Sequence, residues 1–234
     1  MNFASIVMIP GLLCTDDLFR DQISALSGRN VSIADTSQDA TITGMAERLL
    51  ADAPDEFALC GLSMGGYVAL EVIRQAPGRV KAVVLMATSH RNDTPEQIAA
   101  RRRLIAFGQE HGIEAVARQL AGRLLAPGTA NDSLRQRIVA MALSIGFDGF
   151  VRQQEAIIGR ANQSGILSRI DVPVTIVAGT ADAIIAPERS REMAEAIPGA
   201  KLEMLPDVGH MVTMEAPDRA NAILLRGLSL PPAD

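Results

Sequence analysis

Short runs of apolar, often β-branched residues alternate along most of this chain with segments of helical periodicity. The predicted strands cover residues 3–9, 31–34, 57–60, 80–86, 172–177 and 201–205. The predicted helices between them cover residues 17–26, 43–53, 64–75, 188–197 and 217–228. Such alternation is typical of a parallel sheet wound by helices, because parallel strands need long crossover connections. The sequence therefore predicts an α/β fold with a mostly parallel sheet of about six strands.

The middle of the chain departs from this alternation. Between residues 90 and 169 no strand-like run occurs, and apolar residues recur three or four positions apart over 99–105, 116–125 and 134–143. Breaks in this periodicity fall at Gly112, Pro127, Gly128 and Gly146. The sequence therefore predicts a core of residues 1–89 and 170–234. An all-helical insertion, residues 90–169, would begin after the strand that ends near Thr88.

Composition and charge exclude several classes of function. The chain has 22 Lys and Arg against 27 Asp and Glu, a net charge of −5, and only 3% aromatic residues. This balance offers neither a basic surface for phosphates nor stacking platforms for bases, so we expect no nucleic-acid partner. We expect no membrane partner either, because no apolar run reaches the roughly 18 residues of a membrane span and no positively charged leader is present. The expected location is cytoplasmic.

Metal ions and nucleotide cofactors are not expected. Cys14 and Cys60 are far apart in sequence, and the three histidines, His90, His111 and His210, lack the spacing of metal ligands. No strand is followed by a Gly-rich loop with a lysine. We interpret both cysteines as small buried packing residues.

The most informative motif is Gly61-Leu62-Ser63-Met64-Gly65-Gly66, between the strand over 57–60 and the helix from Met64. Glycines flank the serine because a sharp strand-to-helix turn leaves no room for Cβ atoms. Such a turn lifts the serine hydroxyl clear of the sheet at the helix amino end. Ser63 is therefore the candidate nucleophile. The alternative is a Gly-rich turn that only packs closely.

A serine nucleophile needs a base to take its proton and a carboxylate to orient that base. His210 lies in the loop between the last strand and the last helix, and Asp182 lies just past the strand over 172–177. Since the carboxyl ends of parallel strands meet at one edge of a sheet, we expect Ser63, Asp182 and His210 to converge. Asp207 is an alternative orienting acid, although a residue three positions away in the same loop seldom points back.

With this order of serine, aspartate and histidine, the chain resembles the α/β-hydrolase superfamily over nearly its whole length except the insertion. The resemblance implies that Ser63 is the nucleophile, Asp182 the acid and His210 the base. It also implies that residues 90–169 form a cap over the active site. Compared with the superfamily, the two leading antiparallel strands are expected to be absent.

The first strand ends in a segment that matches the oxyanion loop of this family. Residues 9–14 read Ile-Pro-Gly-Leu-Leu-Cys, where the family more often has His-Gly in place of Pro-Gly. The match implies that the backbone N–H groups of Leu12 and Met64 form the oxyanion hole, and Leu13 is an alternative first donor. Each preorganised donor of this kind can contribute about 3 kcal/mol to a transition state.

The resemblance implies a cofactor-independent serine hydrolase that cleaves a small or medium carboxylic ester through an acyl-enzyme. One alternative is an enol-lactone or C–C bond hydrolase of aromatic degradation, and another is a non-catalytic ligand sensor on the same fold. A dehalogenase is disfavoured, because that branch has Asp at the position of Ser63. The expected partner is a small-molecule ester or lactone, and the sequence does not indicate the oligomeric state.

The pocket is predicted to be lined mainly by aliphatic and Met side chains. Its candidate residues in the insertion are Leu104, Ile105, Phe107, Leu120, Leu124, Met141, Leu143, Ile145, Phe147 and Phe150. Arg101, Arg102 and Arg103 are interpreted as a solvated helix face rather than a carboxylate clamp. His90 is interpreted as a polar loop residue that could instead border the pocket, and His111 as a residue at a helix end.

Overall fold

The computed structural model describes residues 5–129 and 131–229, and its sheet confirms the predicted α/β fold. Six parallel strands have the order β2-β1-β3-β4-β5-β6. They are β1 (Ser5–Ile9), β2 (Asn30–Ile33), β3 (Phe57–Leu62), β4 (Val80–Met86), β5 (Val174–Gly179) and β6 (Lys201–Leu205). Of the strand predicted over 3–9, residues 3 and 4 lie outside the described residues.

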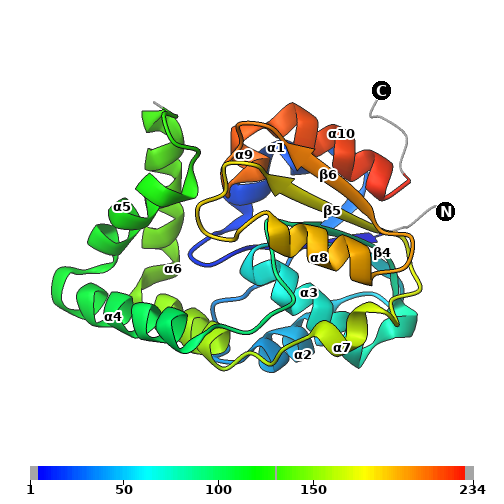
Figure 1. The fold of residues 1–234 in the computed structure, drawn as a ribbon, viewed down its shortest axis with the longest axis horizontal. Helices are drawn as coiled ribbons and strands as arrows, with labels where there is room; N and C mark the ends of the chain where they lie inside the picture. The colour runs from blue at the N-terminus through cyan, green and yellow to red at the C-terminus, as the bar shows by residue number, and fades with distance from the viewer. Residues whose placement is uncertain (1–4, 130, 230–234) are drawn as a thin grey trace.

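Helices cover both faces of the sheet. One face packs against the 3-10 helix η1 (Asp16–Phe19), α1 (Arg20–Ala25), α9 (Val212–Glu215) and α10 (Pro217–Gly227). The other packs against α2 (Ile42–Asp52), α3 (Met64–Gln75) and α8 (Glu188–Ala196). In Figure 1, α1 and α10 lie above the sheet, and α2 and α3 lie below it. Successive residues of β3 accordingly alternate between two apolar cores, Ala58 and Cys60 in one, Phe57 and Leu59 in the other.

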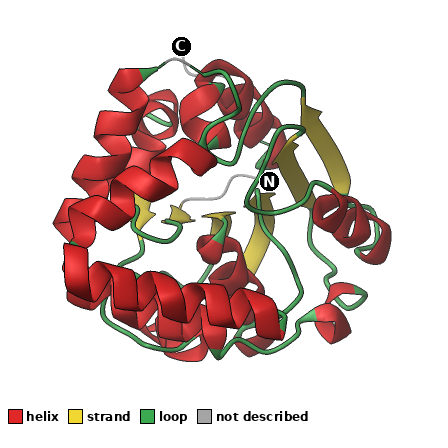
Figure 2. Cartoon of the chain, turned by 60° about the vertical axis from the view of Figure 1, so that its left-hand side comes forward, coloured by secondary structure: helices red, strands yellow, loops and turns green. Residues whose placement is uncertain are grey.

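The described residues between β4 and β5 form helices and connecting loops, without a strand. The helices are α4 (Pro95–His111), α5 (Ile113–Leu124), α6 (Asp132–Ile158) and the short α7 (Ser164–Leu167). In Figure 1, α4, α5 and α6 lie together on one side of the molecule, and the arrowheads of β5 and β6 point toward α5 and α6. Figure 2 shows the same helices packed together as one group. None of the described helices is both long and apolar enough to cross a membrane.

Local sequence explains where these helices begin and end. Thr94 and Gln97 form a capping box at the start of α4, with Pro95 in the first turn. Gly112, at a φ of 82°, separates α4 from α5. Gly146, at a φ of 73°, lies inside α6, which extends well beyond the helix predicted over 134–143 and bends at this glycine. The sequence predicted breaks at both glycines but not that the chain resumes a helix after the second.

The amino end of α3 lies against the backbones of β1 and β3, and one glycine permits each of these close contacts. A Cβ atom at Gly65 would lie 1.9 Å from the carbonyl oxygen of Ile9, and one at Gly61 would lie 2.4 Å from the carbonyl oxygen of Gly65. Both atoms belong to the main chain, so no side-chain rotation could relieve the contact. This approach brings the end of β1 beside the turn that carries Ser63.

Replacing Gly65 with alanine should therefore destabilise the protein strongly. We expect Gly65→Ala to lower the free energy of unfolding by about 3 kcal/mol or more, because the new methyl group forces the main chains of α3 and β1 apart. The measurement is urea unfolding followed by circular dichroism. Gly78→Ala is the control, since a Cβ atom there meets nothing within 4 Å, and it should change the same quantity by less than about 0.5 kcal/mol. Equal stability of the two variants would contradict this account.

Candidate active site

Ser63 lies at the turn between β3 and α3 in a strained backbone conformation. Its φ of 56° and ψ of −114° are rare for a residue with a side chain, and such positions cost about 1–3 kcal/mol. Two hydrogen bonds to the end of β4 hold the turn. The Ser63 N–H donates to the carbonyl of Met86 at 2.9 Å, and the Thr88 hydroxyl donates to the Ser63 carbonyl at 2.7 Å. The turn is therefore fixed by the neighbouring strand.

His210 and Asp182, from the loops after β6 and β5, are hydrogen-bonded to each other. Nδ1 of His210 lies 2.8 Å from Oδ2 of Asp182, and both side chains are buried. Oδ1 of the same carboxylate accepts the backbone N–H groups of Ile184 at 2.8 Å and Ile185 at 3.0 Å. The carboxylate is thus held on both oxygens and orients the imidazole. Asp207 is exposed, so the alternative orienting acid does not occupy this position.

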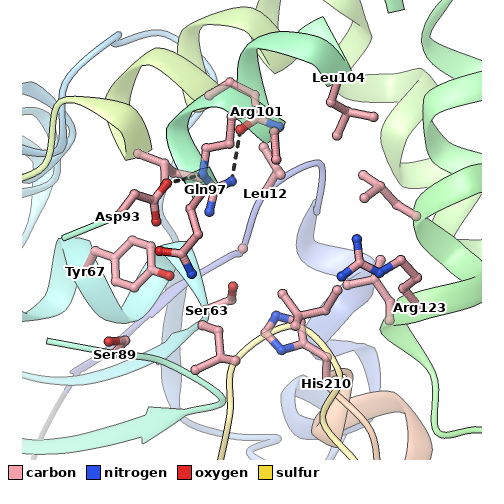
Figure 3. A pocket seen from close by; sticks show the side chains of 18 of the residues that line it. Leu12, Ser63, Tyr67, Ser89, Asp93, Gln97, Arg101, Leu104, Arg123 and His210 are labelled. Carbon is pink, nitrogen blue, oxygen red and sulfur yellow. Dashed lines mark hydrogen bonds and ion pairs between the residues drawn. The ribbon is translucent and has the colours of Figure 1, made fainter. Parts of the chain in front are cut away.

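Ser63 and His210 line one pocket of about 870 Å³. Figure 3 shows the two side chains next to each other at one side of the pocket. Among the described residues, the Ser63 hydroxyl makes no hydrogen bond to His210. Such bonds often tighten only when substrate is bound. Because Nδ1 of His210 faces Asp182, Nε2 is the ring nitrogen left for the pocket.

Leu12 and Leu13, in the loop after β1, are the two candidates for the first oxyanion donor, and their hydrogen bonds distinguish them. The Leu13 N–H donates to Oε1 of Gln153 at 2.9 Å, so this donor is already used. The N–H groups of Leu12 and Met64 have no hydrogen-bond partner among the described residues. Leu12 also lines the pocket, and Met64 begins α3, where the first N–H groups of a helix lack internal partners. The structure therefore leaves Leu12 rather than Leu13 available beside Met64.

Gln153 is a supporting residue that sequence reasoning missed. Its side chain is fully buried in α6, and its Nε2 donates to the carbonyl of Thr36 at 3.3 Å and to the Thr36 hydroxyl at 3.2 Å. It thereby ties the strained Leu13, at a φ of 59°, to the loop after β2. Nothing in the sequence pairs positions 13 and 153, so only the fold could reveal this contact.

Glu215 is a second such residue and holds the His210 loop. Its two carboxylate oxygens accept the backbone N–H groups of Ala126 at 2.7 Å, Met211 at 3.1 Å and Gly209 at 3.2 Å. The His210 N–H also donates to the carbonyl of Leu124 at 2.9 Å. The loop that carries the histidine is therefore anchored to the end of α5.

The pocket lining is largely aliphatic, as predicted from the sequence, but it also contains six arginines that were not predicted. Of the apolar candidates in the insertion, those that line the pocket are Leu104, Phe107, Leu120 and Leu124. Methionine contributes Met211, whereas arginine contributes Arg91, Arg101, Arg103, Arg123, Arg160 and Arg189. The interpretation of residues 101–103 as a solvated face is wrong for Arg101, whose side chain is only 23% exposed and pairs with Asp93. Arg102, with 61% of its side chain exposed, is solvated as predicted.

The other two histidines lie outside the pocket lining. His111 ends α4, as predicted, and its ring centroid lies 4.4 Å from that of Phe107. His90 is in the loop after β4 but is buried, with Nε2 3.8 Å from a carboxylate oxygen of Glu192. Burial lowers the pKa of His90 below its usual value, and the Glu192 carboxylate opposes this shift. Over the described ranges, no three His, Cys, Asp or Glu side chains are placed to hold a metal ion.

Both cysteines are buried thiols, as predicted. Cys60 is fully buried and Cys14 is 6% exposed at the pocket wall. Burial raises the pKa of each thiol to about 12. The reactive thiolate is therefore scarce at neutral pH, and neither cysteine is suited to act as a nucleophile.

These thiols should resist alkylation in the folded protein. At pH 8 we expect iodoacetamide to leave both cysteines unmodified in the native state and to modify both in urea, because unfolding restores ordinary thiol pKa values. Intact-protein mass spectrometry counts the added groups. Rapid modification of Cys14 in the native protein would show that its thiol is activated and would contradict this reading.

Comparisons with known proteins agree with this architecture. The model of the alpha/beta hydrolase family matches residues 10–223. A pimeloyl-[acyl-carrier protein] methyl ester esterase from Aromatoleum aromaticum is 28% identical over 191 residues, which cover 76% of each chain. A 3-oxoadipate enol-lactonase from Acinetobacter baylyi is 26% identical over 164 residues, which cover 69% of this chain and 60% of that one.

Solved structures show the same similarity. A thermophilic esterase from Thermogutta terrifontis, solved with malate bound, has a TM-score of 0.87 and 25% identity, over 96% of this chain and 89% of that one. An enol-lactonase from Burkholderia xenovorans has a TM-score of 0.86 and 25% identity, over 98% and 92% of the two chains. With the family match over most of the chain and the fold described above, this protein belongs to the alpha/beta hydrolase family.

Proposed function

We propose that this protein is a serine hydrolase that cleaves a carboxylic ester through an acyl-enzyme, without a cofactor. The observation that carries the proposal is the 2.8 Å bond between His210 Nδ1 and Asp182 Oδ2, which leaves Nε2 for the pocket lined by Ser63. The named activities of the relatives, esterase and enol-lactonase, belong to the same reaction class.

In the first half of the reaction, Oγ of Ser63 attacks the ester carbonyl while Nε2 of His210 takes the hydroxyl proton. Asp182 keeps the imidazole in the tautomer that can accept this proton and stabilises the imidazolium that results. The carbonyl oxygen becomes an oxyanion, which the N–H groups of Leu12 and Met64 receive. The tetrahedral intermediate collapses, the C–O bond to the alcohol breaks, and the imidazolium returns its proton to the leaving alcohol.

In the second half, a water molecule takes the place of the alcohol. His210 removes a proton from this water as its oxygen attacks the acyl carbon, and the same oxyanion donors serve again. Collapse breaks the bond to Ser63 Oγ, which recovers its proton from the imidazolium. The products are one carboxylic acid and one alcohol, and the side chains return to their starting states.

Residues 90–169 act as a cap in this proposal. Leu104 and Phe107 on α4 and Leu120 on α5 line the same pocket as Ser63. A substrate would thus lie between the sheet edge and these helices, where partial exclusion of water strengthens the oxyanion contacts.

Hydrolysis of an enol-lactone is the second candidate, favoured by the likeness to the Burkholderia xenovorans enol-lactonase over nearly the whole chain. A lactone is an ester whose leaving group stays attached to the acyl chain, so the same three side chains would serve. A panel of acyclic esters and lactones, assayed side by side, separates the two candidates by their kcat/KM values.

Removing the nucleophile tests the proposal. We expect Ser63→Ala to lower kcat on 4-nitrophenyl butyrate by about 10⁴-fold or more, because the acyl-enzyme can no longer form. The control is Ser89→Ala, which removes another serine of the same pocket wall and should change kcat by less than about threefold. Full activity in the Ser63 variant would refute the assignment.

Gln153 should act through the oxyanion loop rather than on the substrate. In Gln153→Leu the Leu13 N–H loses its acceptor, so we expect the loop to shift and kcat to fall by about tenfold or more, with a smaller change in KM. Gln136→Leu, at an exposed position of the same helix, should leave both constants near the wild-type values. An unchanged kcat in the Gln153 variant would show that the hydrogen bond between Leu13 and Gln153 has no catalytic consequence.

A further inference from the structure

We infer that the pocket selects esters whose acyl group carries a second, negatively charged group, such as the free carboxylate of a dicarboxylic acid monoester. The contact that binds this anion would be made by Arg101 and Gln154. The inference rests on the proposed ester hydrolysis and specifies the class of substrate.

The charge of the pocket is opposite to that of the chain. The protein has a net charge of −5, yet six arginines line this pocket. Two carboxylates offset part of this charge, Asp93 against Arg101 and Arg160, and Glu192 against Arg91 and Arg189. Six positive and two negative groups leave a net charge of +4. A concave site with such an excess attracts anions.

Arg101 is part of a largely buried ion-pair cluster with Asp93 and Arg160 and does not lie on a solvated face. Its Nε lies 2.5 Å from Oδ2 of Asp93, and Arg160 lies 2.9 Å from the other oxygen of the same carboxylate. The Arg160 guanidinium also stacks 4.2 Å from the ring centroid of Tyr67. Two guanidinium groups therefore share one carboxylate, and a charge of +1 remains uncompensated at a fixed position.

Gln154 supplies a free donor at this position. Its side chain is fully buried in α6 and lines the pocket, and its Oε1 accepts a hydrogen bond from Arg101 at 3.0 Å. Its Nε2 is buried and has no hydrogen-bond partner among the described residues. A buried amide donor without an acceptor is costly, and an oxyanion of a ligand would satisfy it. The guanidinium and the amide together offer donors of the kind that bind carboxylates.

This group lies on the acyl side of Ser63. His210 must return a proton to the leaving alcohol, so the alcohol lies toward His210 and the acyl group away from it. In Figure 3, Tyr67 and Asp93 lie on one side of Ser63, whereas His210 and Arg123 lie on the other. Tyr67 is also one helical turn beyond Ser63 in α3. An acyl chain that extends from Ser63 past Tyr67 would approach Arg101.

Arg103 and Arg123 add positive charge to the pocket, and no carboxylate of the described residues offsets it. Neither has an ion-pair or hydrogen-bond partner among the described residues, and Figure 3 shows the Arg123 guanidinium pointing into the pocket. Their exposed positions suit attraction of an anionic substrate more than its fixation.

The test compares three substrates of equal acyl length. They are mono-4-nitrophenyl adipate, its uncharged terminal amide and 4-nitrophenyl hexanoate. We expect wild-type kcat/KM to be about tenfold or more higher for the anionic ester than for either neutral one, because the charged end gains a charge-assisted contact. The ratio should fall as salt concentration rises.

Gln154→Glu is the informative variant. It keeps the shape of the side chain and the bond to Arg101, but it replaces the free donor with an acceptor and cancels the +1 charge. We expect the ratio of kcat/KM for the anionic ester to kcat/KM for 4-nitrophenyl hexanoate to fall by about tenfold or more. Gln136→Glu changes the net charge equally at an exposed position of α6 outside the pocket and should preserve the preference.

A wild-type protein that hydrolyses neutral and anionic esters equally, or a preference that survives Gln154→Glu, would overturn the inference while leaving ester hydrolysis intact. If no ester is hydrolysed, isothermal titration calorimetry on Ser63→Ala tests separately whether the pocket binds an anion. Binding of adipate but not of adipamide, lost in Ser63→Ala/Gln154→Glu, would support the anion site although the proposed reaction had failed. If neither compound binds, the proposed anion site would be contradicted as well.

Discussion

The close approach of α3 to β1 is the constraint on which the site depends. Gly65 allows the amino end of α3 to lie against the carbonyl of Ile9, and the following loop then passes beside the turn that carries Ser63. A side chain at this position would separate the helix from the strand. The loop with Leu12 and the turn with Met64, whose N–H groups have no partner in the described part of the chain, are adjacent for this reason. The proposed oxyanion hole is thus a consequence of backbone packing, and the side chains at these two positions remain free to contact substrate.

Buried polar groups from distant parts of the chain then fix each loop. Gln153 on α6 holds the loop after β1, and Glu215 on α9 holds the loop with His210. Because these groups bond to backbone N–H groups, they set positions without contacting the pocket themselves. The helices between β4 and β5 therefore do more than cover the sheet edge, because α6 also holds the loop after β1 in place. This double role links the proposed cap to the geometry of the proposed reaction.

Sequence reasoning predicted the strands, the parallel sheet and the residues Ser63, Asp182 and His210, because these depend on local patterns and on the rule that strand ends converge. It could not find Gln153, whose partner is 140 residues away. It also misread Arg101, because a run of three arginines indicates a solvated helix, and only the fold brings Asp93 and Gln154 to one member of the run. The charge of the pocket was hidden in the same way, since its arginines come from five separate stretches of a chain with net negative charge.

The most direct test of the central claim is a crystal structure of the protein after reaction with a fluorophosphonate ester, which mimics the tetrahedral intermediate. The account predicts a covalent bond from phosphorus to Ser63 Oγ. It also predicts that the phosphonyl oxygen lies within about 3 Å of the backbone nitrogens of Leu12 and Met64. His210 Nε2 should face the alcohol position. An adduct on another residue, or a phosphonyl oxygen directed away from both nitrogens, would contradict the account.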